Sequence, residues 1–152
     1  MINRSHPVPS DVVPRELDGV SPGGESSVAD PSEAESAEAI AWEMARAADN
    51  RKGANIVLLE VGTVSYLADY FAIATGFSRA QVRAIADEIL ERVEQRFGRL
   101  PRNISGQGDA SWVLLDYGDV VAHVMLPEER EFYDLEAFWG HASRIDYVPE
   151  LA

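Results

Sequence analysis

Residues 112–126 read WVLLDYGDVVAHVML, a stretch that contains two short apolar runs with a tight turn between them. The first run is Trp112 to Leu115, the second is Val120 to Leu126, and Tyr117-Gly118 separates them. Short apolar runs with turn residues at their ends are typical of buried strands. Glycine supplies the backbone freedom that a tight turn requires. The stretch therefore predicts a β-hairpin, around which the rest of the chain can be placed.

The segments on either side of this hairpin predict helices. After it, Pro127 fixes φ, and the acids Glu128 and Glu129 suit the positive end of a helix. The apolar face of this short helix consists of Phe132, Leu135, Phe138 and Trp139. Before the hairpin, Ser78 to Gln81 forms a capping box and Gly98 suits a left-handed C-cap. The stripe between them has helical spacing and consists of Val82, Ile85, Ala86, Ile89, Val93 and Phe97.

Further upstream, the sequence predicts another helix and two strands. A possible capping box at Ser32 precedes a helical stripe that ends near Asn50 or Gly53 and consists of Ala37, Ile40, Ala41, Met44, Ala45 and Ala48. The apolar runs 56–59 and 69–75 predict buried strands, and 101–104 predicts an edge strand. The order α-β-β-α-β-β-β-α indicates an α/β fold, in which helices cover a mixed β-sheet of about five strands.

The composition divides the chain into three parts. Residues 1–32 hold five of the eight prolines and no aromatic side chain, so we expect a disordered N-terminal tail. Residues 33–140 form the predicted α/β domain, and residues 141–152 form a C-terminal extension.

The charge and the cysteine content exclude several classes of protein. Thirteen Lys and Arg residues against 26 Asp and Glu residues give a net charge of -13, and Lys52 is the single lysine. This charge argues against a protein that binds bare nucleic acid through many phosphate contacts. An acidic surface favours a basic partner. The absence of cysteine excludes disulfides, thiolate zinc sites and cysteine nucleophiles. Because the chain has neither an apolar run of bilayer length nor a leader pattern, we expect a cytoplasmic protein with no membrane contact.

Acids and aromatic residues gather in the last third of the chain. Residues 79–102 hold six arginines and four acids, whereas residues 109–152 hold ten acids and two arginines, Arg130 and Arg144. The same third contains Trp112, Tyr117, Phe132, Tyr133, Phe138 and Trp139. Aromatic anchors beside Arg and acids are typical of protein-binding surfaces, although about half of such rings belong to the core of a small domain.

The motifs that suggest catalysis are weak. Gly76-Phe77-Ser78-Arg79-Ala80 resembles a nucleophile elbow, for which Asp116 and His123 or His141 are hypothetical partners, but Ala80 replaces the second glycine. Ser78 already suits a helix N-cap. His123, within an apolar strand, is typical of a hydrogen-bonded structural histidine.

A nucleotidyltransferase would hold a triphosphate at this same turn and two metal ions on a carboxylate pair. Asp116 and Asp119 bracket a turn and do not alternate along one face, so they do not form that pair. We therefore expect no catalytic, cofactor or metal site. A nucleotidyltransferase-like, nucleotide-binding enzyme that uses Ser78 and Asp116 stays as the alternative, and a dimeric adaptor that pairs through its C-terminal helix is a third.

Residues 52–139 resemble the ribosomal silencing factor family, also called the Iojap family. The resemblance lies in long ordered blocks: IVLLEV at 56–61, ADYFAIATGFS at 68–78, VRAIADE at 82–88, WVLLDYGDVVAHV at 112–124, LPEEREFYDLE at 126–136 and Trp139-Gly140. It implies a nucleotidyltransferase-like core without catalytic carboxylates. It also implies a non-enzymatic factor that docks on the intersubunit face of the large ribosomal subunit.

The resemblance further implies a partner and a set of contact residues. The partner is the small basic protein that is fourteenth in the large-subunit series, and the bound factor blocks the small subunit and slows translation when nutrients are scarce. We expect Trp112 to be an aromatic anchor, as the equivalent position is in the family. The other expected partner-binding residues are Asp116, Tyr117, Glu128, Glu129, Arg130, Tyr133 and Asp134. We expect little direct contact with nucleic acid, and a homodimer stays open.

Overall fold

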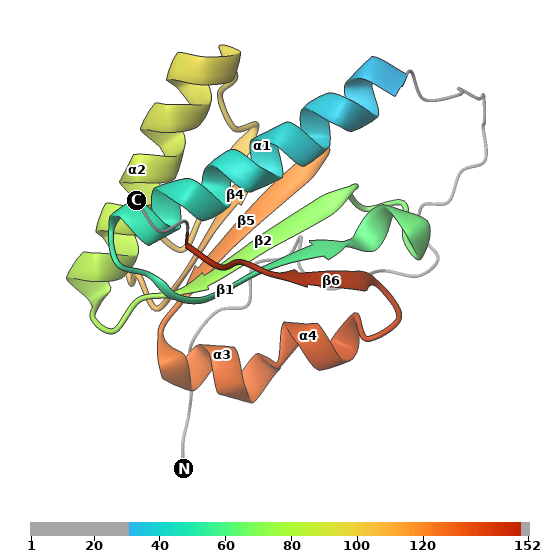
Figure 1. The fold of residues 1–152 in the computed structure, drawn as a ribbon. Coiled ribbons are helices and arrows are strands. Elements are labelled where there is room, and N and C mark those ends of the chain that lie inside the picture. The colour runs from blue at the N-terminus through green and yellow to red at the C-terminus, as the bar shows by residue number, and fades with distance from the viewer. Residues whose placement is uncertain (1–30, 150–152) are drawn as a thin grey trace.

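The computed structural model of the chain describes residues 31–149, and side chains from residue 37 onward. Helices cover both faces of a mixed six-stranded sheet, in which the strand order is β3-β4-β5-β2-β1-β6 (Figure 1). The elements are α1 Pro31–Asn50, β1 Ala54–Glu60, the 3-10 helix η1 Val61–Thr63, β2 Tyr70–Thr75, α2 Arg79–Phe97, β3 Asn103–Ser105, β4 Trp112–Asp116, β5 Val120–Met125, α3 Pro127–Tyr133, α4 Leu135–Phe138 and β6 Ser143–Asp146.

The predicted hairpin lies next to the middle of the sheet. Strands β4 and β5 pair antiparallel with Leu114 opposite His123, and β5 pairs parallel with β2 along its whole length. Strand β1 runs antiparallel to both of its neighbours, β2 and β6. The prediction of a mixed sheet covered by helices is confirmed.

Helix α2 begins and ends at the residues that the sequence indicates. The Ser78 hydroxyl accepts a hydrogen bond of 3.0 Å from the backbone N–H of Gln81. At the other end Gly98 adopts φ 66°, a left-handed conformation that costs glycine little. Both predicted caps are confirmed.

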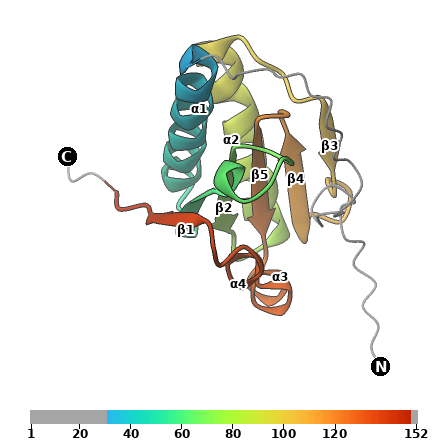
Figure 2. The same cartoon turned by 90° about the vertical axis from the view of Figure 1, so that its right-hand side faces the viewer.

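The sheet separates two apolar cores, and Figure 2 shows the helix pairs α1–α2 and α3–α4 on different sides of the sheet. Successive side chains of a strand point to opposite faces, so along β5 Val120, Ala122 and Val124 pack beneath α1 and α2. Val121 and Met125 point to the other face, which α3 and α4 cover. The second core contains Val57, Leu59, Val61, Ala68, Phe71, Ile73, Trp112, Leu114, Val121, Met125, Leu135 and Trp139.

Three features differ from the sequence prediction. The sheet has six strands and not about five, because Ser143–Asp146, within the predicted C-terminal extension, pairs with β1. Helix α1 begins at Pro31, so residues 31 and 32 belong to it, and the rest of the predicted tail lies outside the described residues. The single short helix after Pro127 is two helices, because Asp134 adopts a left-handed backbone with φ 44°.

None of the helices within residues 31–149 has the length and apolar character that a bilayer crossing requires.

Candidate functional site

Helices α3 and α4 carry two exposed aromatic side chains beside several of the predicted site residues. Pro127 occupies the first turn of α3 beside Glu128 and Glu129, as expected. Asp134 ends α3 and also caps α4, where its carboxylate accepts a hydrogen bond of 3.3 Å from the N–H of Ala137. This break rotates the two helices relative to each other, so the expected single apolar face does not form.

The break sends two aromatic rings outward and two side chains inward. Leu135 and Trp139 are buried, whereas Phe132 and Phe138 are 74% and 59% exposed. The predicted apolar face is therefore divided, with Leu135 and Trp139 in the core and the two phenylalanines at the surface. Glu128, Glu131 and Asp134 are exposed on the same short segment. We call Glu128, Glu131, Phe132, Asp134 and Phe138 the aromatic–acidic surface.

A continuous series of ring contacts joins this surface to the core. Phe132 packs edge-on against Tyr133 with ring centroids 4.8 Å apart, and Tyr133 lies 4.8 Å from the Trp112 ring. Phe138 contacts Trp139 at 5.5 Å in the same edge-on manner. Such pairs contribute roughly 0.5–1.5 kcal/mol each beyond burial. The exposed rings are thus held in fixed orientations by rings beneath them.

The structure separates the eight predicted partner-binding residues into three classes. Trp112, Asp116, Tyr117 and Glu129 are buried, Arg130 and Tyr133 are half-buried, and Glu128 and Asp134 are exposed. Asp116 and Tyr117 also lie at the far end of the hairpin. Leu126, which directly precedes α3, donates a backbone hydrogen bond to Ser111, so α3 lies near the start of β4. Asp116 is at the opposite end of β4, where its carbonyl accepts a backbone hydrogen bond from Arg102. The structure does not bring the eight residues together on one surface.

Trp112 is a core residue and not an exposed anchor. It is 3% exposed, and its indole Nε1 donates a hydrogen bond of 3.2 Å to Nδ1 of His123. Since indole nitrogen can only donate, Nδ1 of His123 carries no proton and Nε2 carries it. A side chain this buried does not present the aromatic surface that the prediction requires, and the Trp112 ring packs instead against Tyr133, with ring centroids 4.8 Å apart. The bulky side chain is buried because it points to the face of the sheet that α3 and α4 cover.

His123 is the hydrogen-bonded structural histidine that the sequence predicts. It is fully buried, and its ring lies 4.6 Å from that of Phe71. Burial, with a smaller effect from the charge of Arg130, lowers the pKa of His123 from 6.5 to about 3. The imidazole is therefore neutral at physiological pH.

The groups that would support catalysis have structural partners. The Ser78 hydroxyl caps α2. Asp116 accepts hydrogen bonds from Arg102 and from the N–H of Gly118, and Asp119 forms a two-pronged pair with Arg99 at 2.8 and 3.1 Å. Across the part of the chain whose side chains are described, no three His, Asp or Glu residues gather where they could hold a metal ion.

The arginines of residues 79–102 also have internal partners. Arg92 and Arg96 bind the buried carboxylate of Glu43 on α1 at 3.2 Å each, and Arg92 also binds Glu88. Arg79 pairs with Asp109. These ion pairs leave the basic segment of the sequence largely neutralised within the fold, so it does not form a free basic surface.

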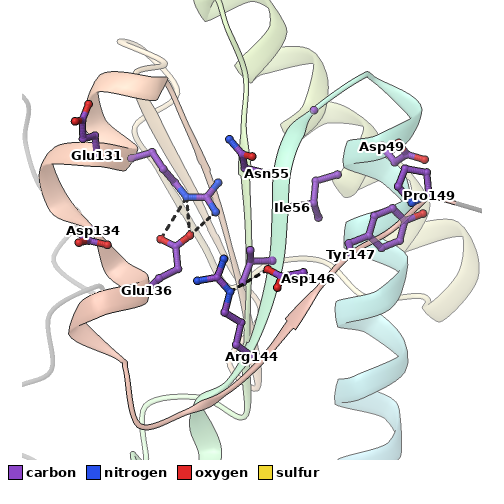
Figure 3. A pocket seen from close by; sticks show the side chains of 13 residues that line it. Asp49, Asn55, Ile56, Glu131, Asp134, Glu136, Arg144, Asp146, Tyr147 and Pro149 are labelled. Carbon is purple, nitrogen blue, oxygen red and sulfur yellow. Dashed lines mark hydrogen bonds and ion pairs between the residues drawn. The ribbon is translucent and has the colours of Figure 1, made fainter.

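A groove of about 630 Å³ lies beside α3 and α4. Figure 3 shows Glu131, Asp134 and Glu136 on one side, and Asn55, Ile56 and Asp146 on the other. Two ion pairs line the groove, Arg130 with Glu136 and Arg144 with Asp146. The sequence did not indicate this groove, because its walls come from segments that are as far apart as Asp49 and Pro149.

Comparison with known proteins identifies the family. The family model described as "Ribosomal silencing factor during starvation" matches residues 34–151. The chain belongs to the ribosomal silencing factor family. The Bacillus subtilis ribosomal silencing factor is 41% identical over 102 residues, which cover 67% of this chain and 86% of that protein. The chloroplastic Iojap protein of Arabidopsis thaliana is 40% identical over 111 residues, which cover 71% of this chain but only 44% of that longer protein.

Solved structures of related bacterial proteins have the same fold. A crystal structure of a Chromobacterium violaceum protein is 34% identical with a TM-score of 0.66, and the match covers 76% of this chain and 92% of that one. A Bacillus halodurans structure, also 34% identical, gives 0.62 and covers 72% and 99%. The sequence resemblance to the ribosomal silencing factor family is confirmed. Curated relatives such as the Bacillus subtilis protein are named ribosomal silencing factors, and this name supports a connection to translation regulation.

Sequence reasoning missed the exposure of Phe132 and Phe138 and the internal role of Arg130. The signal that could have shown the helix break is Asp134, since aspartate directly before a new apolar residue is a common N-cap pattern. No local pattern would have indicated that Arg130 reaches β2, because that contact joins residues 55 positions apart.

Proposed function

We propose that the chain binds the large ribosomal subunit at its intersubunit face, blocks joining of the small subunit and so represses translation under nutrient limitation. It acts in the cytoplasm and without catalysis. Its docking partner is the basic fourteenth protein of the large subunit. The family supports the connection to the ribosome, and the aromatic–acidic surface supports the mode of docking.

The observation that carries this proposal is the pair of exposed phenylalanines among carboxylates. Large apolar side chains that gather on a surface mark interaction sites, and aromatic residues are frequent among the few that dominate binding energy. Glu128, Glu131 and Asp134 give the same surface a negative charge. A net charge of -13 repels RNA phosphates and favours a basic protein patch on the particle.

The mechanism requires only occupancy. A stable interface covers about 800 Å² on each partner. A protein that covers an area of that size where the small subunit must contact the large subunit prevents the two subunits from joining for as long as it stays bound. We propose direct contacts for Glu128, Tyr133 and Asp134, together with Phe132 and Phe138. We propose that Trp112 and Glu129 support α3 from within the core, and that Asp116 and Tyr117 hold the turn between β4 and β5.

Cosedimentation with purified large subunits tests this function. We expect the wild-type chain to sediment with them at moderate salt and a Phe132→Ser, Phe138→Ser double variant to stay in the supernatant. Crosslinking at Phe132 should identify the fourteenth protein as the neighbour. Failure of the wild-type chain to sediment would contradict the function, and a crosslink to RNA alone would contradict the partner. Light scattering of the free chain decides whether it is a homodimer.

A further inference from the structure

Arg130 is one of the least exposed arginines of the described residues. Its side chain is 11% exposed and that of its partner Glu136 is 16% exposed. Its Nε donates to Oε2 of Glu136 at 3.0 Å, and its Nη2 donates to the same carboxylate. Its Nη1 donates to Oγ1 of Thr75 at 2.8 Å. One guanidinium therefore joins α3, where it originates, to α4 and to the end of β2.

Helix α3 has few apolar contacts that could fix its orientation. Of its seven residues only Glu129 is buried, so no apolar side chain of α3 is fully buried in the core. Phe132 points to solvent, and Tyr133 is only half-buried against Trp112. Most helices are held by an apolar stripe, which α3 lacks. Polar contacts must therefore contribute most to the orientation of α3.

The Arg130 contacts are of the kind that can do so. A charge-assisted, two-pronged bond between guanidinium and carboxylate is directional as well as strong, and partial burial reduces its screening by solvent. Glu136 stays ionised in this setting: burial raises the pKa of its carboxyl, but hydrogen bonds and charge from Arg130 outweigh burial and lower it overall. Figure 3 shows Glu136 with these bonds at the side of the groove.

We infer that Arg130 is a positioning residue, which fixes α3 against β2 and α4 and so sets the pose of the aromatic–acidic surface. This differs from the direct partner contact that the sequence suggests for it. The binding consequence rests on the proposed function, whereas the effect on α3 does not.

Lysine at position 130 discriminates between the two roles. It keeps the positive charge, but its single ammonium lacks the planar fork that engages Thr75 and Glu136 together. If Arg130 positions α3, Arg130→Lys should weaken both the protection of the α3 amides and the binding to large subunits. If Arg130 only supplies charge to a partner, Arg130→Lys should change neither. A matched control exists in the same groove, where Arg144 pairs with Asp146 on the same strand, with side chains 50% and 68% exposed. Arg144→Lys should change little, because that pair joins no two elements.

The experiment measures amide hydrogen exchange and binding to large subunits for the full-length variants. We expect Arg130→Lys to speed exchange of the α3 amides at least tenfold, to leave the sheet amides unchanged and to weaken binding at least tenfold. The exchanged pair Arg130→Glu with Glu136→Arg should restore slow exchange and part of the affinity. Thr75→Val removes one contact with little change of volume, so it should speed α3 exchange by a smaller factor.

Three results would overturn the inference. The first is an α3 amide exchange rate equal to that of the wild type in both the Arg130→Lys and the Thr75→Val variant. The second is weakened binding by Arg130→Lys with unchanged α3 exchange, which would indicate direct contact. The third is an equal effect of Arg144→Lys. If the wild-type chain fails to bind large subunits, the proposed function fails, and the exchange data still decide the role of Arg130.

Discussion

Trp112 and His123 are joined side chain to side chain across the β4–β5 pair, where Nε1 of the indole donates to Nδ1 of the imidazole at 3.2 Å. Both side chains are buried on the face that α3 and α4 cover. Because Trp112 also contacts Tyr133, which contacts Phe132, the pair links the interior of the sheet to the proposed docking surface. Mutations in the core should therefore lower stability and also disturb the surface, whereas mutations of the exposed rings should leave the core intact.

Replacing Trp112 should affect stability first. Truncation of a large buried aromatic residue costs about 3–5 kcal/mol, so Trp112→Ala should lower the free energy of unfolding by that amount. Trp112→Phe keeps a ring but leaves Nδ1 of His123 without its donor, which should cost about 1–3 kcal/mol. Urea denaturation followed by circular dichroism measures both. A Trp112→Ala variant as stable as the wild type would contradict the burial of this ring.

His123 should make the protein less stable at mildly acidic pH. Burial lowers its pKa to about 3 in the folded chain, from an ordinary value of 6.5. Between these values the unfolded state binds a proton that the folded state does not, so stability falls as pH falls below 6.5. The loss attributable to His123 should reach roughly 2 kcal/mol at pH 5. Comparing His123→Gln with the wild type at pH 7.5 and pH 5.0 isolates it, and equal pH dependence in the two chains would refute the assignment.

The exposed phenylalanine of α3 should matter more for binding than for folding. Phe132 is 74% exposed, so Phe132→Ser should lower the free energy of unfolding only by about the 0.5–1.5 kcal/mol that its ring contact with Tyr133 contributes. Loss of a dominant aromatic contact should weaken binding to large subunits by more than about 1 kcal/mol. Leu100 is a matched control, because it is similarly exposed, at 67%, but precedes β3 at the far end of the hairpin. Equal effects of Phe132→Ser and Leu100→Ser would contradict the proposed surface.

Ser78 should act as a helix cap and nothing more. Ser78→Ala removes the hydrogen bond to Gln81 and should destabilise the fold by about 1 kcal/mol, while binding to large subunits stays unchanged. An enzyme that uses Ser78 would instead bind nucleotide, and a native-state ligand must raise the melting temperature. A nucleotide- and Mg²⁺-dependent rise in the wild type that Ser78→Ala abolishes would support the enzyme alternative.

The sequence predicted those parts of the fold that local chemistry determines. The turn at Gly118, the caps at Ser78 and Gly98, and Pro127 at the start of α3 depend on neighbouring residues, and each appears in the structure. Strand β6 was missed because Ser143–Asp146 is mostly exposed and polar, so no apolar pattern marks it. Its strand conformation comes from pairing with β1, a contact between distant segments.

The site was harder to predict than the fold. Aromatic residues in the last third of the chain have similar local contexts, yet Trp112 is in the core and Phe132 is in solvent. The difference depends on the left-handed backbone at Asp134 and on the position of β4 inside the sheet. The family resemblance indicates residues of this region, but only the three-dimensional arrangement separates the exposed residues from the buried ones.

The most direct test of the central claim is the rate at which purified small and large ribosomal subunits associate, followed by light scattering with increasing amounts of the protein. The account predicts that association slows in proportion to the fraction of large subunits occupied, and that the Phe132→Ser, Phe138→Ser variant relieves the block at the same concentration. Subunits that associate at an unchanged rate when the wild-type chain saturates them would contradict the account.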